Sequence, residues 1–361
     1  MHCPGKATAQ KIPALPAYQG IYNSCEIDTA LSACEAQDSQ MVSDGWNVEV
    51  NYIGLAAYLT NAQNAQSLQA IFTYDASIGM TQLINVKLAL NDPNGVLTGT
   101  SLYDSDNHIG EGCTAGTTNA DIIDCVYNVA ASVPGFNWMW YYFDEPGCPG
   151  STGFCQGSLA GGNYKNVDTL ARYLKSIDPN HVATGVNTPG GCTDSSCPQS
   201  QENALYSTDG QSSYCWMTCA STPYTGYDFY PICASGYPGC DQGSIDSIGY
   251  LAGLIQNTIN ANHPVEKMTF VVQAFSWYQE GGGYGCSSIS VCPYPTTAQI
   301  QDMRDQALYY GHAAGNTPFM ILYYYWPDIV CEHDYTGCNP TASRASVSVA
   351  GHAPFPTSPP A

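Results

Sequence analysis

Short apolar runs alternate with helical stretches along most of this 361-residue chain. Each run is bounded by turn residues and is rich in β-branched and aromatic side chains, which is typical of strands. The expected strands are Ala17–Asn23, Asn47–Gly54, Asn85–Asp92, Phe136–Pro146, His181–Asn187, Tyr227–Ile232, Lys267–Trp277 and Pro318–Trp326. Eight strands that alternate with helices predict an α/β fold, a single (β/α)8 barrel of the TIM type.

An open, doubly wound sheet is the alternative architecture for such an alternation. No Gly-rich turn follows the first expected strand, and this favours the barrel. The expected helices are Asp28–Ser43, a stretch ending near Met80, Asp121–Ala131, Tyr164–Ile177, Ser244–Asn260 and Thr296–Ala314. We therefore expect an N-terminal extension over 1–16, a barrel domain over 17–345, and a Pro- and Ser-containing tail over 346–361, extended or loosely held.

Seventeen cysteines are present, and sixteen of them form eight close couples along the chain. No Cys-x-x-Cys motif occurs, so disulfides are favoured over zinc, and disulfides indicate a secreted, extracellular or periplasmic protein. Most couples follow an expected strand, so we predict disulfides that staple the βα loops. The expected pairs are Cys25–Cys34, Cys113–Cys125, Cys148–Cys155, Cys192–Cys197, Cys215–Cys219, Cys233–Cys240, Cys286–Cys292 and Cys331–Cys338. Cys3 is left over, and an odd cysteine in a secreted chain can support self-association.

The net charge of −21 excludes several classes of partner. A chain this acidic is repelled by nucleic acid and by anionic lipid. No run approaches the ~18 apolar residues of a membrane span. No phosphate loop, dinucleotide fingerprint or Gly-x-Ser-x-Gly elbow occurs, so we expect no cofactor. The histidines are scattered, so we expect no metal; Glu332, His333 and Asp334 could bind a cation but fit a solvated loop better.

Carboxylates and aromatic residues gather at the ends of the expected strands, where a barrel carries its chemistry. Glycoside hydrolysis needs two such carboxyl groups, one that protonates the leaving oxygen and one that is ionised. Aromatic faces beside them would stack on sugar rings. Glu49 and Asn51 add polar groups within the second expected strand. The candidate residues at strand ends are Asp92, Asp144, Glu145, Asp228, Tyr230, Gln273, Trp277, Tyr325 and Trp326.

The segment FNWMWYYFDEP resembles the strand-four motif of the (β/α)8 glycoside hydrolases, and FVVQAFSW resembles their strand-seven motif. The resemblance implies that Glu145 is the general acid/base, and that Asp144 replaces an Asn that contacts the sugar. It also places Gln273 where the family has its nucleophile, and an amide can neither attack nor ionise. The implied ligand is a poly- or oligosaccharide.

Two residues could supply the second carboxylate. Asp228 is preferred, because a strand places a group more rigidly than a loop does, and Glu280 is the alternative. Asp144, Gln273, Trp277, Tyr230, Tyr325, Trp326 and Asp92 would then contact the sugar. Two other functions stay open, a glycan-binding protein without activity and a structural or adhesive extracellular protein. Each residue also has a structural alternative: Glu145 could order a loop, and Asp228 could cap a turn.

Overall fold

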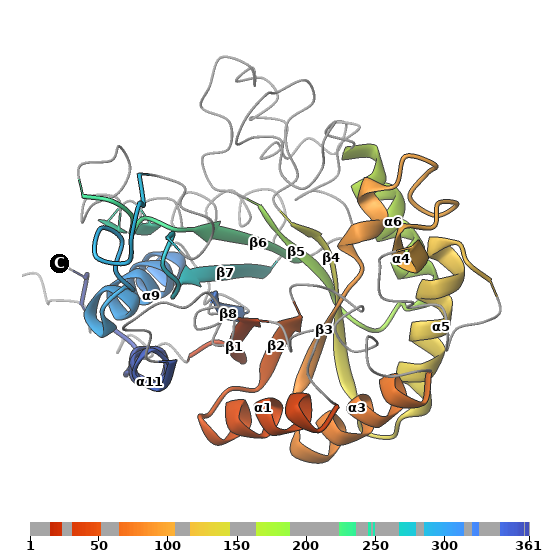
Figure 1. Ribbon diagram of the computed structural model, residues 1–361, viewed down its shortest axis with the longest axis horizontal. Helices are drawn as coiled ribbons and strands as arrows, with labels where there is room; N and C mark the ends of the chain where they lie inside the picture. The colour runs from red at the N-terminus through yellow and green to blue at the C-terminus, as the bar shows by residue number, and fades with distance from the viewer. Residues whose placement is uncertain are drawn as a thin grey trace, which may run out of the picture.

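The computed structural model describes residues 15–23, 31–51, 65–104, 116–144, 164–187, 224–235, 245–246, 248–249, 267–278, 285–313, 320–324, 340–356 and 358–360. Within these ranges, parallel strands pair in chain order into a closed barrel (Figure 1). The strands are β1 Tyr18–Asn23, β2 Val48–Asn51, β3 Thr81–Asn85, β4 Asn137–Asp144, β5 Ala183–Asn187, β6 Tyr224–Phe229, β7 Lys267–Gln273 and β8 Met320–Tyr324.

The pairing of the first strand with the last closes the sheet. Tyr18 of β1 is in register with Met320 of β8, and the pairing continues to Tyr22 and Tyr324. An open, doubly wound sheet has no such pair, so this alternative is excluded. The expected α/β barrel is confirmed, and it places the carboxyl ends of all the strands on one rim.

The core has two layers, one inside the barrel and one between the sheet and the helices. In β4, Met139 and Tyr141 belong to the interior cluster, whereas Trp138 and Trp140 belong to the cluster under the helices. This alternation follows from the two-residue period of a strand. Because both faces of β4 are covered, its sequence reads as a continuous apolar run.

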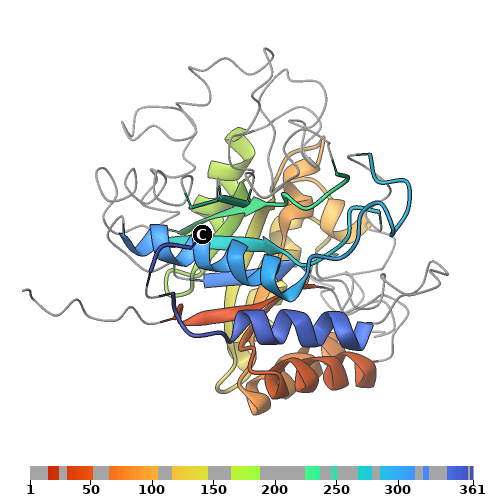
Figure 2. The ribbon, with the colours of Figure 1, turned by 90° about the vertical axis from the view of Figure 1, so that its left-hand side faces the viewer.

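The helices cover the outside of the barrel. Figure 2 shows α11 beside α9 on one side, with α1 next to it. Thr118 begins α5 with a capping box, in which its hydroxyl accepts from the Asp121 N–H and the Asp121 carboxylate accepts from Thr118. The helices are α1 Leu31–Ser43, α3 Ala65–Ile78, α4 Ser101–Asp104, α5 Asn119–Ser132, α6 Tyr164–Ile177, α9 Thr297–Ala313 and α11 Pro340–Gly351, with the short 3-10 helix η1 at Lys87–Asn91. Most of the helix expected at Ser244–Asn260 lies outside the described residues.

The expected third strand, Asn85–Asp92, is wrong. Strand β3 is Thr81–Asn85, and the residues after it form η1. Apolar and polar residues are interspersed throughout Met80 to Leu90 (MTQLINVKLAL), so hydrophobic pattern alone does not locate the end of the strand. The end is set by tertiary contact, because the N–H of Val86 donates to the carbonyl of Tyr141 in β4 and the chain then turns.

The tail expected from Ser346 also differs from the structure. Helix α11 continues to Gly351, and the segment after it is held by Arg304 of α9. The buried guanidinium donates to the carbonyl oxygens of Ala350 at 3.1 Å and Ala353 at 2.6 Å. These carbonyls lie at a helix end, where backbone acceptors have no partner within the helix. Arg304 therefore binds the end of α11 to the barrel.

Asp178 organises the amino end of the barrel, opposite to the rim formed by the carboxyl ends. Its carboxylate accepts hydrogen bonds from the indole N–H groups of Trp138 at 3.2 Å and Trp140 at 2.9 Å, and contacts the His181 ring at 2.8 Å. The His181 ring stacks on Trp138 with centroids 3.5 Å apart. Burial alone would raise the pKa of Asp178, but the hydrogen bonds from His181 and Trp140 outweigh it and hold the pKa below its ordinary value.

Asp178→Asn should lower the free energy of unfolding by about 2–3 kcal/mol near pH 7, because hydrogen bonds to a charged acceptor are lost. The depressed pKa means that the stabilisation is present above the unfolded-state pKa of about 3.9 and is lost as the pH falls through the folded-state value. Urea unfolding of both proteins from pH 7 to pH 3 checks this. The exposed Asp246→Asn is the matched control, with an expected change within about 0.5 kcal/mol. A constant difference down to pH 3 would contradict the assignment.

Candidate active site

Two acidic positions lie on the interior face of the barrel at its carboxyl rim. Asp144 of β4 is in register with Val186 of β5, and Asp228 of β6 is in register with Val271 of β7. Both valines belong to the interior cluster. Residues in register across parallel strands occupy the same face of the sheet, so positions 144 and 228 are on the inner face. The barrel thus brings together two of the predicted site positions from different strands.

A β-bulge in β4 sets the position of Asp144. The register shifts between Tyr141 and Phe143, so Tyr142 has no register partner in β5. Without the shift, alternation from the interior residue Tyr141 would place position 143 inside and position 144 outside. Bulges of this kind redirect the residues that follow them and recur beside active sites. Glu145, the next residue, lies outside the described residues, as do Tyr325, Trp326, Glu280, Cys3 and residues 331–338.

Gln273, at the end of β7, is a buried structural amide rather than a free sugar contact. Its Oε1 accepts from the N–H of Ile232 at 2.7 Å, and its Nε2 donates to the carbonyl of Ile232 at 2.8 Å. Nε2 also donates to the carbonyl of Phe275 at 3.2 Å, and the residue is 0% exposed. Both N–H groups of the amide are therefore used within the protein.

This geometry explains why an amide stands at this position. A carboxylate could accept from the N–H of Ile232, but it would face two carbonyl oxygens with no proton between them. The side chain of Gln273 thus satisfies the backbone N–H and carbonyl of Ile232, in the segment that follows β6 and carries Tyr230. Gln273 therefore positions that segment.

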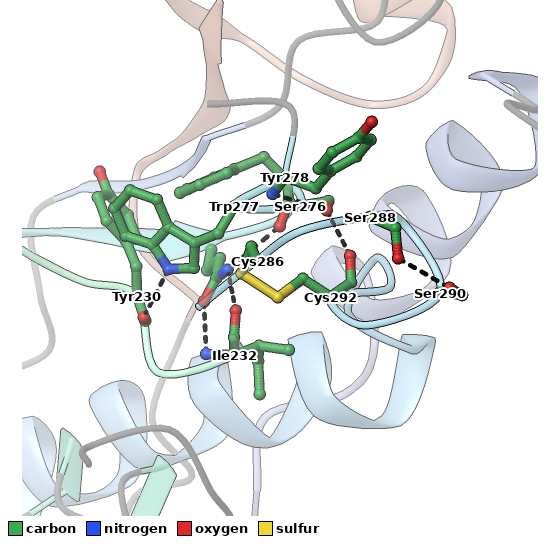
Figure 3. Close-up of a disulfide and its surroundings, with 11 residues drawn as sticks. Tyr230, Ile232, Ser276, Trp277, Tyr278, Cys286, Ser288, Ser290 and Cys292 are labelled. Carbon is green, nitrogen blue, oxygen red and sulfur yellow. Dashed lines mark hydrogen bonds between the residues drawn. A yellow bond between two sulfur atoms is a disulfide. The ribbon is translucent and has the colours of Figure 1, made fainter. Parts of the chain in front are cut away.

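Aromatic side chains border the rim beside Gln273. Tyr230, Phe275 and Trp277 pack edge to face, with ring centroids between 5.0 and 5.9 Å apart. The indole N–H of Trp277 donates to the carbonyl of Tyr230 at 3.3 Å (Figure 3). Tyr230 and Trp277 are only partly buried, whereas Phe275 is buried beneath them. Such rings present apolar faces with polar tips, which suits contact with sugars. Sequence reasoning missed Phe275 and Tyr278, although both belong to the aromatic stretch Phe275–Tyr278.

A disulfide packs against two of the aromatic residues at this rim, Trp277 and Tyr278. Cys286 and Cys292 are bonded and buried, as predicted, and they pack with Cys233 against Trp277 and Tyr278 (Figure 3). Ser276 connects the two segments, since its hydroxyl donates to the carbonyl of Cys292 and accepts from the N–H of Tyr278. Cys125 and Cys233 are also disulfide-bonded, while Cys113 and Cys240, their expected partners, lie outside the described residues.

Asp92 does not lie at a strand end, and its carboxylate is used within a loop. It accepts from the N–H groups of Asn94 at 2.8 Å and Ser101 at 2.7 Å. Burial alone would raise the pKa of Asp92, but these backbone donors outweigh it and hold the pKa below its ordinary value. Gly99 lies so close that an added Cβ would be 1.9 Å from the carboxyl carbon. The carboxylate of Asp92 therefore orders the loop between η1 and α4, and does not lie free to contact a sugar as predicted.

Glu49 also lies away from the rim site. Its neighbours Val48 and Val50 are in the interior cluster, so Glu49 lies on the outer face of β2, under the helices. Among the described residues, no group of three or more Asp, Glu, His or Cys side chains is arranged to hold a metal ion. In the same part of the chain, no helix is long and apolar enough for a membrane span.

Comparison with solved structures identifies the same fold in glycoside hydrolases. The endo-1,4-beta-mannanase from Rhizomucor miehei matches with a TM-score of 0.50 and 13% identity, over 92% of this chain and 93% of the mannanase. A GH5-4 broad specificity endoglucanase from an uncultured bacterium matches with a TM-score of 0.52 and 8% identity, over 95% and 98% of the two chains. No protein-family model matches the sequence, and no curated protein matches it either. At such low identity the likeness establishes the fold.

Gln273→Glu should destabilise the protein by about 1–3 kcal/mol at neutral pH, because the buried carboxylate loses two donated hydrogen bonds. The environment raises the pKa of the new carboxyl group above its unfolded-state value. Protonation should therefore restore stability as the pH falls toward about 4, where the neutral acid again donates. Denaturant unfolding at pH 7 and pH 4.5 measures the difference.

Gln299→Glu is the matched control for this variant. Gln299 begins α9 in a capping box with Thr296, whose N–H donates to the Gln299 side chain at 2.9 Å. A carboxylate is favourable there, so the same chemical change should leave stability unchanged or raise it by up to about 1 kcal/mol. Equal destabilisation by both variants would show that the Gln273 contacts are not specific.

Removing the disulfide through Cys286→Ser with Cys292→Ser should cost about 2 kcal/mol, since the bridge closes a loop with a sequence separation of only 6. The loss should be local. Limited proteolysis should cut within residues 279–292 sooner than in the wild type, while the circular dichroism of the barrel stays unchanged. Unfolding of the whole barrel would contradict a local role for this bridge.

Proposed function

We propose that this chain is a secreted, glycoside hydrolase-like barrel that cleaves glycosidic bonds in a poly- or oligosaccharide. In this proposal Glu145 is the general acid/base and Asp228 is the partner carboxylate. Asp144, Trp277 and Tyr230 would position the sugar, together with Tyr325 and Trp326. The disulfides support an extracellular setting.

One observation carries the proposal. Position 228 of β6 and position 144 of β4, which directly precedes Glu145 in the sequence, share the inner face of the barrel at its carboxyl rim. The aromatic group of Tyr230, Phe275 and Trp277 lies on the β6–β7 side of the same rim. In barrel enzymes this rim is where chemistry takes place. Acidic groups next to partly exposed aromatic rings fit a sugar better than they fit an anionic ligand.

The side chain of Gln273 is hydrogen-bonded to the backbone of Ile232, and this limits which residues could act as the second catalytic carboxylate. Its amide cannot ionise, so a second carboxylate has to come from another strand or loop. Asp228 is preferred because β6 is paired along its length with β7, which holds its position. Glu145 would protonate the leaving oxygen, and Asp228 would attack the anomeric carbon or activate a water. A separation of ~5–5.5 Å between the two carboxyl groups would give retention, and ~6.5–9.5 Å would give inversion.

The names of the structural neighbours suggest the first substrates to test. One is an endo-1,4-beta-mannanase and the other a broad specificity endoglucanase. Mannans and glucans carry no charge, whereas the net charge of −21 of this chain disfavours polyanionic sugars by repulsion. We therefore propose neutral β-linked mannans and glucans as the substrate class.

Glu145→Gln and Asp228→Asn should each reduce release of reducing ends from such polysaccharides by about 10²–10⁴-fold, since each removes a proton-transfer or charged group. Asp246→Asn, an exposed change, should leave turnover intact. Circular dichroism and unfolding midpoints should show that all three variants are folded. Full activity in Glu145→Gln would refute the assignment of the acid/base.

A second function is supported by Gln273 itself. A barrel that has lost the strand-seven carboxylate could bind glycans without cleaving them. Saturable binding of a mannan or glucan by the wild type, with no product after prolonged incubation, would favour this function over hydrolysis.

Self-association through Cys3 has its own test. It would appear as oligomers that a reductant converts to monomers.

A further inference from the structure

Three carboxyl groups are buried together on the outer side of the barrel, away from the rim. Asp38 of α1 and Asp75 of α3 are 0% exposed, and Glu49 of β2 is 3% exposed. Val48 and Val50 lie in the barrel interior, so Glu49 lies on the opposite face of the strand, between the sheet and the two helices. We refer to Asp38, Glu49 and Asp75 as the carboxyl cluster.

The cluster has few hydrogen-bond donors. The Nε2 group of Gln82, in β3, donates to Glu49 Oε1 at 2.5 Å and to Asp75 Oδ2 at 2.8 Å. Both carboxyl oxygens of Asp38, and Oδ1 of Asp75, are buried with no hydrogen-bond partner among the described residues. A buried carboxylate without donors or a counter-ion is strongly destabilising, whereas a protonated carboxyl group is tolerated and can itself donate.

The neighbours that act on Asp38 and Asp75 in the described part of the chain carry no positive charge. Glu35 of α1 adds a further negative charge that acts on Asp75. The Tyr74 hydroxyl of α3 is hydrogen-bonded to Ser39 of α1 between the same helices. The described ion pairs that involve arginine or histidine, Arg304–Asp305 and His181–Asp178, lie elsewhere. No described group of ligands is arranged to hold a metal ion.

Burial raises the pKa of Asp38, and the neighbouring charges of Glu49 and Asp75 raise it further. The pKa of Asp75 is raised in the same way, by burial first and then by Glu49, although Gln82 and Asp38 oppose this in part. Both directions agree with the missing donors, because burial and the neighbouring negative charges favour the neutral form of each acid.

We propose that protons shared within the carboxyl cluster hold α1 and α3 against β2 and β3, so that this side of the barrel is a pH-sensitive element. Acid groups that bind protons more tightly in the folded state stabilise it fully below the unfolded-state pKa. That stabilisation is lost as the pH rises through the folded-state values. A rise in pH therefore loosens the α1–α3 side first. This inference does not depend on the proposed catalytic activity.

Hydrogen exchange of the full-length wild type from pH 5 to pH 9, corrected for the intrinsic exchange rate, tests the proposal. Amides of residues 31–51 and 65–85 should lose protection before those of β6 and β7. Unfolding in urea should show that the unfolding equilibrium constant rises about tenfold per pH unit for each proton taken up on folding.

Asp75→Asn and Asp38→Asn mimic the protonated acids and should each reduce this pH dependence by about tenfold per pH unit, which corresponds to one proton. Asp246→Asn is the control for net charge, and it should leave the slope unchanged. Equal slopes in Asp75→Asn, Asp38→Asn and Asp246→Asn would overturn the proposal, because the pH dependence would then come from overall repulsion.

Two measurements on the wild type keep the proposal testable if a variant does not fold. Infrared spectra should show protonated carboxyl groups in the folded protein wherever α1 and α3 are protected, and their absorption should vanish together with that protection as the pH rises. Absence of that absorption would overturn the proposal. Recovery of protection at pH 8 by Ca²⁺, reversed by a chelator, would also overturn it, since a cation rather than protons would then fill the cluster.

Discussion

Closure of the parallel sheet by the pairing of β1 with β8 is the constraint on which the other features depend. It brings all the strand carboxyl ends to one rim, so that residues far apart in sequence share a site. It also leaves strand side chains either inside the barrel or under the helices, so a buried polar side chain in a strand needs a partner in one of these two layers. Gln273 lies at the inner rim, and Glu49 and Gln82 lie under the helices.

The chain has only nine lysine and arginine residues, and the buried acids Asp92 and Asp178 are held by other donors. Asp92 uses backbone N–H groups, and Asp178 uses two indole N–H groups and a histidine. In both cases the donors outweigh burial and the pKa is lowered. In the carboxyl cluster, Asp75 accepts from the amide of Gln82, whereas both oxygens of Asp38 and Oδ1 of Asp75 have no hydrogen-bond partner among the described residues. There burial outweighs the donors and the pKa is raised.

Gln273 links the fold to the proposed chemistry. Its amide accepts a hydrogen bond from the N–H of Ile232 and donates one to the carbonyl of Ile232, and an ionised carboxylate could not donate the second. The aromatic group of Tyr230, Phe275 and Trp277 and the Cys286–Cys292 bridge are built on the same segment. The rim beside β6 and β7 is therefore held by short-range contacts that do not involve any ligand, and Asp228 lies in a strand that these contacts hold in place.

Much of the architecture could be predicted from the sequence, because apolar periodicity is a local property. The alternation of strands and helices, the limits of α6 and the Cys286–Cys292 pair all follow from residues close together in the chain. The end of β3, the face on which Asp144 lies and the partner of Gln273 do not. The first depends on a hydrogen bond from Val86 to Tyr141, the second on a bulge, and the third on a residue 41 positions away. The sequence by itself determined a barrel with acids and aromatic residues at its strand ends. Only the tertiary structure decided which acids share a face and which are buried without donors, since both depend on contacts between distant segments.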